Sequence, residues 1–390
     1  MSKDTRNVPV LRFKGFSDAW EKRKLGSVFN YEQPTPYIVN SENYNDQYPT
    51  PVLTAGKSLV LGYTDENEGI KLASKHKPVI IFDDFTTSSH LIDFPFKVKS
   101  SAMKILSTSS DSDDVYFSFG LLSNLHYEPK NHERHWISQF SAFKVQTPST
   151  TEQKRIGKTL LRIDDLIAAT QGKLDCLERV KKALLQHLFD QSMRFKGYSN
   201  PWEKRNLIDQ LSLLKDGTHG THKDGDFAFL LSAKNVIQNS IVFDDSDRKI
   251  SEDDFNDVYA NYHIKKNDVL LTIVGTIGRV ALFPRLTVPV AFQRSVAILR
   301  TKPTLFPYFL ALELQTPSIQ SKIKARANMS AQAGIYLGDL KKIVIAIPKS
   351  EEQIEIAMFL NRLTNLIAAT QSKLSNLESL KKALLQGLFI

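Results

Sequence analysis

The segment LIAATQ at residues 166–171 recurs without change at residues 366–371, and this repeat decides the fold. The match extends without a gap from Glu152–Phe189 onto Glu352–Phe389, where 23 of the 38 positions are identical. Internal repeats of this kind define the architecture of a chain before any single element does. The sequence therefore predicts two copies of one long structural unit.

A second repeat lies upstream of each copy. RFKGFSDAWEKRKL at 12–25 matches RFKGYSNPWEKRNL at 194–207, again without a gap. The variable segments, roughly 26–150 and 208–350, show no comparable similarity to each other. The chain is thus a twofold duplication that has constant frames and divergent inserts.

The constant segments predict long helices, because apolar residues recur at alternating spacings of four and three, which is a heptad seam. Thr170 and Lys181 interrupt the first seam, and Thr370 and Lys381 interrupt the second at equivalent places. A 38-residue helix is a rod of about 57 Å and cannot bury such a seam alone. The predicted seam residues are Ile156, Leu160, Ile163, Ile167, Leu174, Leu177, Leu184, Leu188, Ile356, Leu360, Leu363, Ile367, Leu374, Leu377, Leu384 and Leu388.

We expect the two helices to pair with each other in an antiparallel coiled coil, which relates the two halves by a pseudo-twofold axis. The small residues Ala168, Ala169, Ala368 and Ala369, beside the two threonines, are expected to let the helices approach closely. The alternative is that each amphipathic helix lies on a globular core.

The inserts predict mixed modules with many short strands, so the fold class is α+β with two α/β modules separated by the two long helices. The predicted organisation is a first module at 1–150, a central helix at 151–192, a second module at 193–350 and a C-terminal helix at 351–390. The strand candidates are 78–82, 94–100, 141–145, 227–232, 267–275, 279–283 and 294–300, and 306–314 and 317–325 predict two short helices. Gly275 and Gly278 predict a hairpin turn or a close backbone approach.

Composition narrows the class of protein. The 390 residues carry 51 Lys and Arg against 42 Asp and Glu, a formal charge of +9 that favours polyanions such as DNA. No stretch reaches the roughly 18 apolar residues that span a membrane, and the first residues lack an apolar signal-peptide region. One cysteine, Cys176, excludes an internal disulfide framework. We expect a cytoplasmic protein without membrane partners.

The search for catalytic chemistry finds no complete motif. GKS at 56–58 lacks the upstream glycine of a phosphate-binding loop, because Pro51 stands there. His126, His132 and His135 are more typical of surface or DNA-facing residues than of a metal site. The carboxylate pairs at 83–84 and 244–245 are either metal ligands or, more commonly, acidic turn residues. The sequence therefore predicts no catalytic residue, no metal site and no cofactor in this chain.

What remains is a binding geometry. Two unlike modules on a rod can read two sites on one long ligand, and about 57 Å corresponds to roughly 17 base pairs of DNA. Base reading requires side chains at groove edges, with Lys and Arg on phosphates. The predicted DNA-contacting residues, all in expected loops, are Lys57, Ser58, Lys75, His76, Lys77, Lys130, Arg134, Lys215, Thr218, His219, Thr221, Lys223, Lys234, Asn235, Arg294, Lys324, Arg326 and Gln332.

Several motifs resemble one family, the specificity subunits of type I restriction-modification systems. They are WEKRKL and WEKRNL (20–25 and 202–207), DGTH (216–219), NDVLLTIVGTIGRV (267–280), QRSVAILR (293–300), and the joins TPSTTEQKRI (147–156) and IPKSEEQIEI (347–356). The resemblance covers essentially the whole chain. The first insert departs from it, since it lacks a DGTH-like element.

The resemblance implies a non-catalytic subunit in which each module reads half of a split, asymmetric DNA sequence while the paired helices fix the spacer. It implies double-stranded DNA and two modification subunits as partners, and restriction subunits can be further partners. S-adenosylmethionine, ATP and magnesium would then belong to those partner subunits. Two alternatives stay open: a fused enzyme with catalysis in one insert, and a coiled-coil scaffold for proteins without a DNA role.

Overall fold

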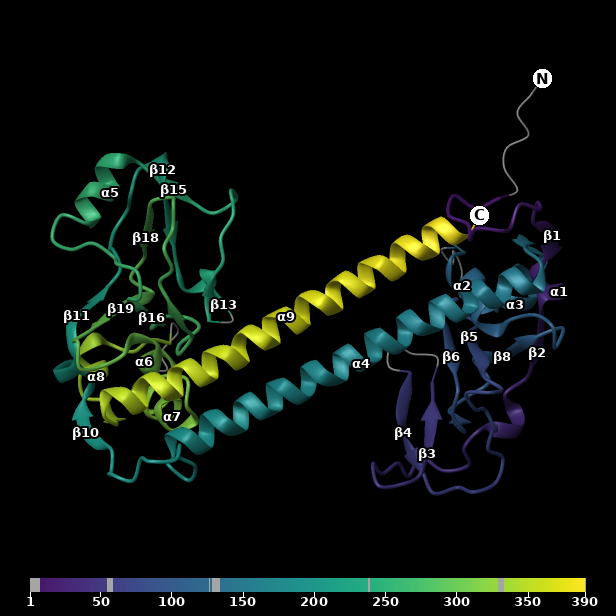
Figure 1. The fold of residues 1–390 in the computed structure, drawn as a ribbon, viewed down its shortest axis with the longest axis horizontal. Coiled ribbons are helices and arrows are strands. Elements are labelled where there is room, and N and C mark those ends of the chain that lie inside the picture. The colour runs from purple at the N-terminus through teal and green to yellow at the C-terminus, as the bar shows by residue number, and fades with distance from the viewer. Residues whose placement is uncertain are drawn as a thin grey trace. The chain divides into compact units, whose positions relative to one another are not determined.

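The computed structural model describes residues 8–54, 59–125, 127, 134–237, 239–328 and 333–389. These residues form two compact units (Figure 1). Unit 1 comprises the described part of 1–173 and 371–390, and unit 2 comprises the described part of 174–370. The two long helices, α4 (Thr150–Phe189) and α9 (Ser350–Leu388), each contribute one part to unit 1 and one part to unit 2.

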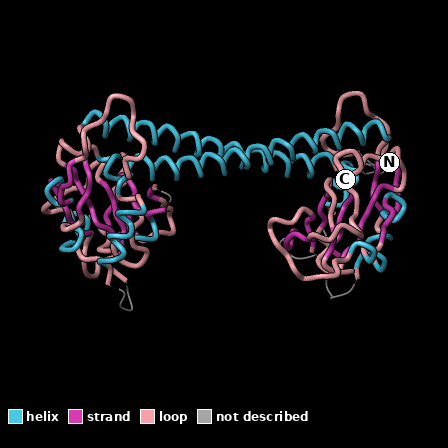
Figure 2. The backbone as a smooth tube through the Cα atoms, turned by 90° about the horizontal axis from the view of Figure 1, so that it is seen from below, coloured by secondary structure: helices cyan, strands magenta, loops and turns pink. Residues whose placement is uncertain are grey.

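The direction of the helix pair is visible inside each unit. In unit 1, the core contains Ile156 from the start of α4 together with Leu388 from the end of α9. In unit 2, the core contains Leu188 from the end of α4 together with Ile356 from the start of α9. The start of one helix therefore packs beside the end of the other, and the predicted antiparallel coiled coil is confirmed. Within each unit the two helix segments run side by side (Figure 2).

The seam is buried with the predicted period. Nine predicted seam residues are less than a tenth exposed, and the other seven are half-buried. Thr170 and Thr370, each 6% exposed, lie on the same buried face. The prediction for Ala168, Ala169, Ala368 and Ala369 is wrong, because all four are exposed. Their heptad positions place them on the outward face of each helix, so they do not line the contact between the two helices.

Unit 1 contains three sheets. The first is an antiparallel sheet of four strands in the order β2 (Phe29–Glu32), β8 (Met103–Thr108), β5 (Val79–Asp83) and β6 (Ser89–Ile92). The second has the order β4 (Val60–Thr64), β3 (Thr50–Leu53) and β7 (Lys97–Val98), and β3 runs parallel to β7. The third pairs β1 (Glu21–Lys24) with β9 (Lys144–Thr147). The helices are α1 (Leu25–Val28), α2 (Val115–Ser123) and α3 (His135–Ser138).

Unit 2 repeats this plan. Its four-stranded sheet has the order β11 (Leu211–Asp216), β19 (Val296–Thr301), β16 (Val269–Thr272) and β17 (Val280–Leu282). Its three-stranded sheet has the order β15 (Lys249–Ile250), β12 (Asp224–Leu231) and β18 (Val290–Phe292), and β12 runs parallel to β18. β10 (Glu203–Asn206) pairs with β20 (Val344–Ile347), and β13 (Val236–Ile237) pairs with β14 (Ser240–Ile241). The helices are α5 (Glu252–Val258), α6 (Pro307–Glu313), α7 (Pro317–Arg326) and α8 (Leu337–Leu340).

The two inserts therefore share one strand topology although their sequences do not align. In each four-stranded sheet, the spatial order is the first, fourth, second and third strand in chain order: β2-β8-β5-β6 in unit 1 and β11-β19-β16-β17 in unit 2. The parallel pairs β3–β7 and β12–β18 also correspond. A sheet needs only alternating or continuous apolar character at its strands, so residue identity can diverge while the topology stays. The inserts are duplicated folds, which inspection of the sequence does not reveal.

Most predicted elements are present, with bounds that differ by a few residues. The segments at 78–82 and 294–300 overlap β5 and β19, which each extend one residue further, and the two predicted short helices are α6 and α7. The strand prediction at 141–145 is wrong in its first part, because Phe140–Ala142 is a 3-10 helix. The segment at 94–100 holds only the two residues of β7. Local propensity does not fix strand ends, because pairing with a neighbour decides them.

An aromatic cluster joins the frame to the insert in unit 1. Trp20 from the entry motif packs edge-on to Phe117 of α2, with ring centroids 5.8 Å apart. Phe389, directly after α9, stacks on Phe117 at 5.3 Å. Such aromatic pairs each contribute about 0.5–1.5 kcal/mol beyond their buried area. The end of one long helix is thereby anchored against the insert.

Unit 2 contains the same cluster from the other copy. Trp202 packs on Phe309 of α6 at 5.6 Å, and Phe189 at the end of α4 packs on Phe309 at 5.0 Å. The end of α4 thus has the role in unit 2 that the residue after α9 has in unit 1. This exchange of helix ends is what the sequence repeat encodes.

A buried ion pair closes each frame. The Arg12 guanidinium donates two hydrogen bonds of 2.8 Å to Glu152, and Arg194 donates bonds of 2.9 and 2.7 Å to Glu352. Both glutamates are at most 2% exposed, and Trp202 Nε1 also donates to Glu352. The bidentate geometry is the strong form of a charged hydrogen bond. The EQ joins are therefore structural contacts between the entry motif and the start of each long helix.

Candidate nucleic-acid interface

In unit 2, the DGTH segment and the QRS segment lie side by side. The Thr218 N–H donates to Phe292 O at 2.7 Å, and the Arg294 N–H donates to Thr218 O at 3.0 Å. β11 and β19 position these residues, because both segments are at the same end of the four-stranded sheet. The fold therefore brings together two motifs that are about 75 residues apart in the chain.

A third segment completes this end of the sheet. The Ile335 N–H donates to Ile273 O at 2.9 Å, which ties the chain after α7 to the loop after β16. That loop turns at Gly275 and Gly278, whose φ angles of +77° and +92° favour glycine, as the hairpin prediction requires. Gln320 of α7 donates to Gly278 O at 2.8 Å and fixes the loop.

These three segments line a cavity of about 220 Å³. Asp216, His219, Arg294, Asn328 and Tyr336 are among its lining residues. Tyr336 is 70% exposed, and the His219 ring lies 2.7 Å from the Asp216 carboxylate. An exposed tyrosine ring offers a stacking surface, and an arginine fork recognises guanine edges or phosphate. We define Asp216, His219, Arg294, Asn328 and Tyr336 as the unit 2 reading cluster.

Three predicted residues near this cluster make contacts within unit 2. Lys215 lies 4.4 Å from the centroid of the Tyr262 ring. Lys234, exposed, pairs with Asp247 at 2.7 Å, and its hydrogen bond is the main cause that lowers the pKa of Asp247 to about 2. The prediction for Asn235 is wrong: it is 3% exposed, and its side-chain amide donates to Val242 O and to the Asp247 carboxylate. A buried amide with its donors used shapes a turn and does not face a ligand.

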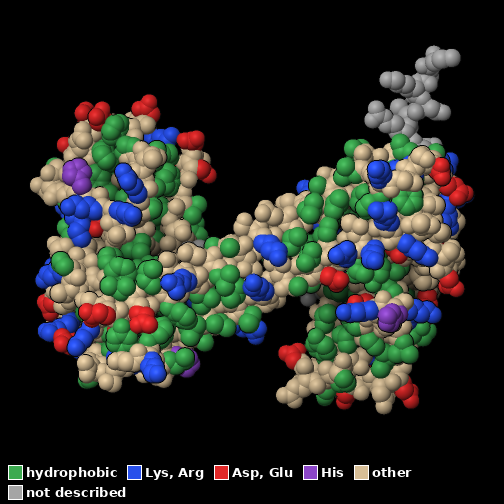
Figure 3. Space-filling model, in the orientation of Figure 1, with side chains coloured by type: hydrophobic (Ala, Val, Ile, Leu, Met, Phe, Trp, Pro, Cys, Tyr) green, Lys and Arg blue, Asp and Glu red, His purple; other side chains and the backbone are tan. Residues whose placement is uncertain are grey.

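The remaining predicted residues of unit 2 are exposed but more dispersed. Thr221 and Lys223 flank His222, whose Nε2 lies 2.9 Å from Thr218 Oγ1, in the segment between the DGTH motif and β12. Lys324 and Arg326 are in the last turn of α7, close in sequence to Asn328. Gln332 lies outside the described residues. Figure 3 shows Lys and Arg side chains interspersed with Asp and Glu on the visible face of both units.

In unit 1, the predicted residues do not form one cluster. Lys75, His76 and Lys77 are exposed on a tight turn before β5, closed by mutual backbone hydrogen bonds between residues 74 and 77. Arg134 lies at the opposite end of the sheet, where its guanidinium approaches Ser101 Oγ at 3.5 Å. The loop of Ser101 joins β7 to β8, as the Arg294 loop joins β18 to β19. Lys57, Ser58 and Lys130 lie outside the described residues.

A buried ion pair occupies this end of the unit 1 sheet. Lys104 is 0% exposed, donates to Gln33 at 3.0 Å and lies 3.4 Å from the Asp84 carboxylate. The other Asp84 carboxylate oxygen accepts the Trp136 N–H at 2.9 Å. A buried lysine requires such a partner, because an unpaired buried charge is costly. Asp84 is thus a structural residue.

The other carboxylates and histidines are also accounted for. Asp83 accepts the N–H groups of Phe85 and Thr86, so it caps a turn, and Asp244 does the same for Ser246. His135 is 1% exposed, which corrects the prediction of a surface or DNA-facing residue. His126 and His132 lie outside the described residues. Among the residues that the structure describes, no three His, Cys, Asp or Glu side chains gather as metal ligands.

Sequence reasoning missed part of the cluster. Asp216 belongs to a recognised motif, but Asn328 and Tyr336 follow a helix end where no pattern marks them. Their association with Arg294 depends on the pairing of residues 274 and 328 with Gly334.

The two duplicated modules and their exchanged helix ends define a class: two α/β modules of one topology, each packed on the antiparallel ends of two long helices. The model of the type I restriction modification DNA specificity domain matches residues 17–179 and 221–379. The chain therefore belongs to this family. No helix in the described part is long and apolar enough to cross a membrane.

Two relatives and one solved structure show the extent of the likeness. The chain is 39% identical over 186 residues to the specificity subunit of the type I restriction enzyme EcoR124I/EcoR124II of Escherichia coli, a match that spans 46% of each protein. It is 20% identical to the MjaVIII specificity subunit of Methanocaldococcus jannaschii over 94% of this chain and 91% of that protein. The fold is similar to the S subunit of a type I restriction-modification system from M. genitalium, with a TM-score of 0.69, 14% identity and coverage of 98% and 99%.

Proposed function

We propose that this chain is the DNA sequence-recognition subunit of a type I restriction-modification complex, and that each unit reads one half of a bipartite, asymmetric site. One observation carries this proposal: two inserts with one strand topology present unlike residues at the same sheet end. Two different half-sites require two modules that share one fold but carry different residues in the loops that face DNA. Family membership and the net charge of +9 support the same conclusion.

The proposed role is recognition without catalysis. Modification subunits that methylate adenine N6 would dock on this chain, two of them for the two halves, and restriction subunits would join the same complex. S-adenosylmethionine, ATP and magnesium would bind to those partners. Because the ligand is cellular DNA, we place the protein in the cytoplasm.

Sequencing of methylated adenines tests the proposal directly. DNA modified by the assembled complex is expected to carry methyl groups in one split motif with two different halves and a fixed spacer. Complexes without this chain are expected to leave that motif unmethylated. A single continuous motif, or two identical half-sites, would contradict the proposed division of the two units.

The spacer has its own test. We expect that removing four residues from α4 and four from α9, at matched places in the repeat, shortens the spacer by about two base pairs while both half-sites stay the same, since four helical residues rise about 6 Å. The matched control is removal of four residues from the 34–49 region of the first insert. A spacer that stays unchanged after the helix deletions would rule out the helices as its determinant.

A further inference from the structure

Backbone hydrogen bonds at the ends of the four-stranded sheets match residues of one insert with residues of the other. In unit 1, Asp84 directly follows β5, and its N–H donates to the carbonyl of Ala102, the residue before β8, at 3.1 Å. In unit 2, Ile273 directly follows β16, and its N–H donates to the carbonyl of Ser295, the residue before β19, at 2.9 Å. Asp84 therefore corresponds to Ile273, and Ala102 corresponds to Ser295.

This match places Ser101 of unit 1 at the position of Arg294 in unit 2, because each stands one residue earlier in the chain. Unit 1 thus carries a hydroxyl where unit 2 carries an exposed guanidinium. The guanidinium of Arg134 lies 3.5 Å from Ser101 Oγ. Unit 1 therefore presents an arginine fork at the equivalent place, although this arginine comes from another segment of the chain.

The segment that carries Arg134 crosses the strand end as its counterpart in unit 2 does. The His135 N–H donates to Asp84 O at 2.9 Å, and the Ile335 N–H donates to Ile273 O at 2.9 Å. Both bonds end on the carbonyl of the residue that follows β5 or β16. The chain before α3 and the chain before α8 are thus equivalent parts of the two modules.

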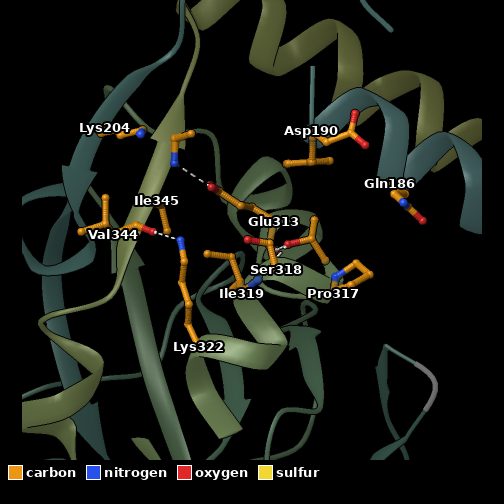
Figure 4. Close-up of a pocket in the computed structure, with 13 residues that line it drawn as sticks. Gln186, Asp190, Lys204, Glu313, Pro317, Ser318, Ile319, Lys322, Val344 and Ile345 are labelled. Atoms are coloured by element: carbon orange, nitrogen blue, oxygen red, sulfur yellow. Dashed lines mark hydrogen bonds between the residues drawn. The ribbon is translucent and has the colours of Figure 1, made fainter. Parts of the chain in front are cut away.

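Unit 2 anchors this segment through the two helices that precede it. The Ala346 N–H donates to Glu313 Oε1 of α6 at 2.7 Å, and Lys322 Nζ of α7 donates to Val344 O at 3.0 Å, as the dashed lines in Figure 4 mark. These bonds attach α6 and α7 to β20. The chain after α7 therefore starts from a fixed point on the frame.

Unit 1 has a different anchor, the buried carboxylate of Asp84. Its Oδ1 accepts the Trp136 N–H at 2.9 Å, in addition to the bond from the His135 N–H to its carbonyl. Lys104, 3.4 Å from the other carboxylate oxygen, compensates the buried charge. The two backbone N–H groups directly after Arg134 are therefore bonded to one residue, and Asp84 is a positioning residue for Arg134.

Arg134 has the properties of a residue that reads a base. It is exposed, and within the described part of the chain it forms no ion pair, so donors of its fork remain available to a ligand. An arginine fork can donate to O6 and N7 of one guanine at once, which is the commonest specific contact in the major groove. A backbone held at two points favours such a directed contact over a mobile contact to phosphate.

We propose that Arg134, positioned by Asp84 and supported by Ser101, reads a guanine in the half-site of unit 1. Arg294 has the corresponding position in unit 2, so the two units reach the same place from different segments of the chain. The inference rests on the proposed reading of DNA by this chain. It adds which residue of unit 1 specifies a base and which base that residue specifies.

Sequencing of methylated adenines in DNA modified by the assembled complex separates this inference from the proposed function. The half-site of unit 1 is the one that changes when residues 26–150 are exchanged, and it must contain a G·C pair. Absence of a split motif would contradict the proposed function and the inference with it. A split motif whose unit 1 half contains no G·C pair would overturn the role of Arg134 alone.

Competition assays identify the contact with DNA in which each G·C pair of that half-site is replaced in turn by A·T. We expect the unmodified complex to lose affinity about tenfold or more at one of these pairs. Arg134→Ala and Arg134→Lys should no longer distinguish the two base pairs there, because lysine keeps the charge but lacks the fork. Unchanged discrimination of the second half-site checks that both variants fold. Undiminished discrimination in Arg134→Lys would overturn the base contact.

A guanidinium returned on the other segment provides the last test. Arg134→Ser combined with Ser101→Arg places the fork on the loop before β8, as Arg294 is placed before β19. This double variant should recover discrimination at the same base pair to within about threefold of the unmodified protein. Lys144→Ala, which changes an exposed lysine of β9 in the frame, is the control and should leave both half-sites unchanged. A double variant that discriminates no better than Arg134→Ala would contradict the equivalence on which the inference rests.

Discussion

Units 1 and 2 have the same strand order but differ at the corresponding end of their four-stranded sheets. In unit 1, Lys104 stands opposite Phe82, one residue before the end of β5, and is buried against Asp84. In unit 2, the matching position in β19 is Ala297, which stands opposite Leu271, also one residue before the end of β16. A buried charge network thus occupies one sheet end, and an open cavity lined by the unit 2 reading cluster occupies the other.

This difference shows which parts of the fold can vary. The aromatic clusters and the Arg–Glu pairs are the same in both units because they join the helices to the inserts. The exposed loop residues at the sheet ends do not join the helices to the inserts, so they can change without loss of the architecture, whereas the buried Lys104–Asp84 pair of unit 1 is structural. The proposed recognition of DNA sequence is therefore assigned to these ends, where the frame imposes the weakest constraint.

Exchange of the first insert is expected to have the largest effect. Replacing residues 26–150 with the insert of another family member should change one half-site completely and leave the other half-site intact. The replacement must supply an aromatic residue at the place of Phe117, since Trp20 and Phe389 pack on it. Sequencing of methylated adenines measures the result. A change in both half-sites would show that the units do not read DNA independently.

The second-largest effect is expected from removal of the glutamate of each Arg–Glu pair, and the loss of stability should differ between the two units. Glu352→Ala leaves the partly buried Arg194 without its partner, and the lost charged hydrogen bonds should cost unit 2 about 1.5–3 kcal/mol in the free energy of unfolding. Glu152→Ala should cost unit 1 about 1 kcal/mol less, because Trp202 donates to Glu352 while Trp20 Nε1 has no described partner. Urea unfolding of both variants gives the two values. Equal losses of unfolding free energy in the two variants would show that the hydrogen bond from the Trp202 indole does not account for a difference between the units.

Single arginines test the two reading surfaces. Arg294→Ala should weaken binding to DNA by about 1–3 kcal/mol through the second half-site only. Arg134→Ala is the matched variant in unit 1 and should act through the first half-site only. Competition assays with DNA altered in one half-site at a time distinguish the two effects. If Arg294→Ala loses affinity equally for every DNA sequence, its contact is to phosphate and not to a base.

The smallest expected effect concerns the interrupted seam. Lys381 pairs with Asp164 at 2.6 Å in unit 1, but Thr364 stands at the matching position opposite Lys181 in unit 2. Burial lowers the pKa of Lys181, so folding disfavours its protonated form, and stability should rise as the pH approaches the ordinary lysine value of 10.5. Thr364→Asp should add about 0.5 kcal/mol near neutral pH and flatten that rise.

Thermal unfolding in low salt, with a repeat at high salt, measures the Thr364→Asp effect. Asp164→Thr is the reciprocal variant and should lose a similar amount in unit 1. A gain that survives high salt would not come from the ion pair, because exposed pairs are screened.

The long helices could be predicted residue by residue, because heptad spacing is a local property of the chain. Every predicted seam residue is buried or half-buried, and Leu166 and Leu366, which fall off the seam, are exposed. The alanines beside the threonines were misjudged, since small size does not decide which face a residue takes. The helix period decides it.

The loops and strand ends could not be predicted in the same way. Asn235 looks like a base-reading residue in the sequence, but hydrogen bonds to Val242 and Asp247 fix it inside a turn. Tyr336 carries no motif, yet pairing of the chain after α7 with the β16 loop places it beside Arg294. These positions depend on contacts between residues far apart in the chain.

The sequence by itself therefore determined the duplication, the helix pair and the family, because repeats and heptad spacing are local patterns that can be recognised without knowledge of long-range contacts. The tertiary structure alone decided that both inserts share one topology, that the helix ends are exchanged between units, and which loop residues meet. It also decided that Glu313 is buried with an unpaired oxygen. Each of these outcomes rests on long-range packing, which fixes burial and hydrogen bonds after the local elements have formed.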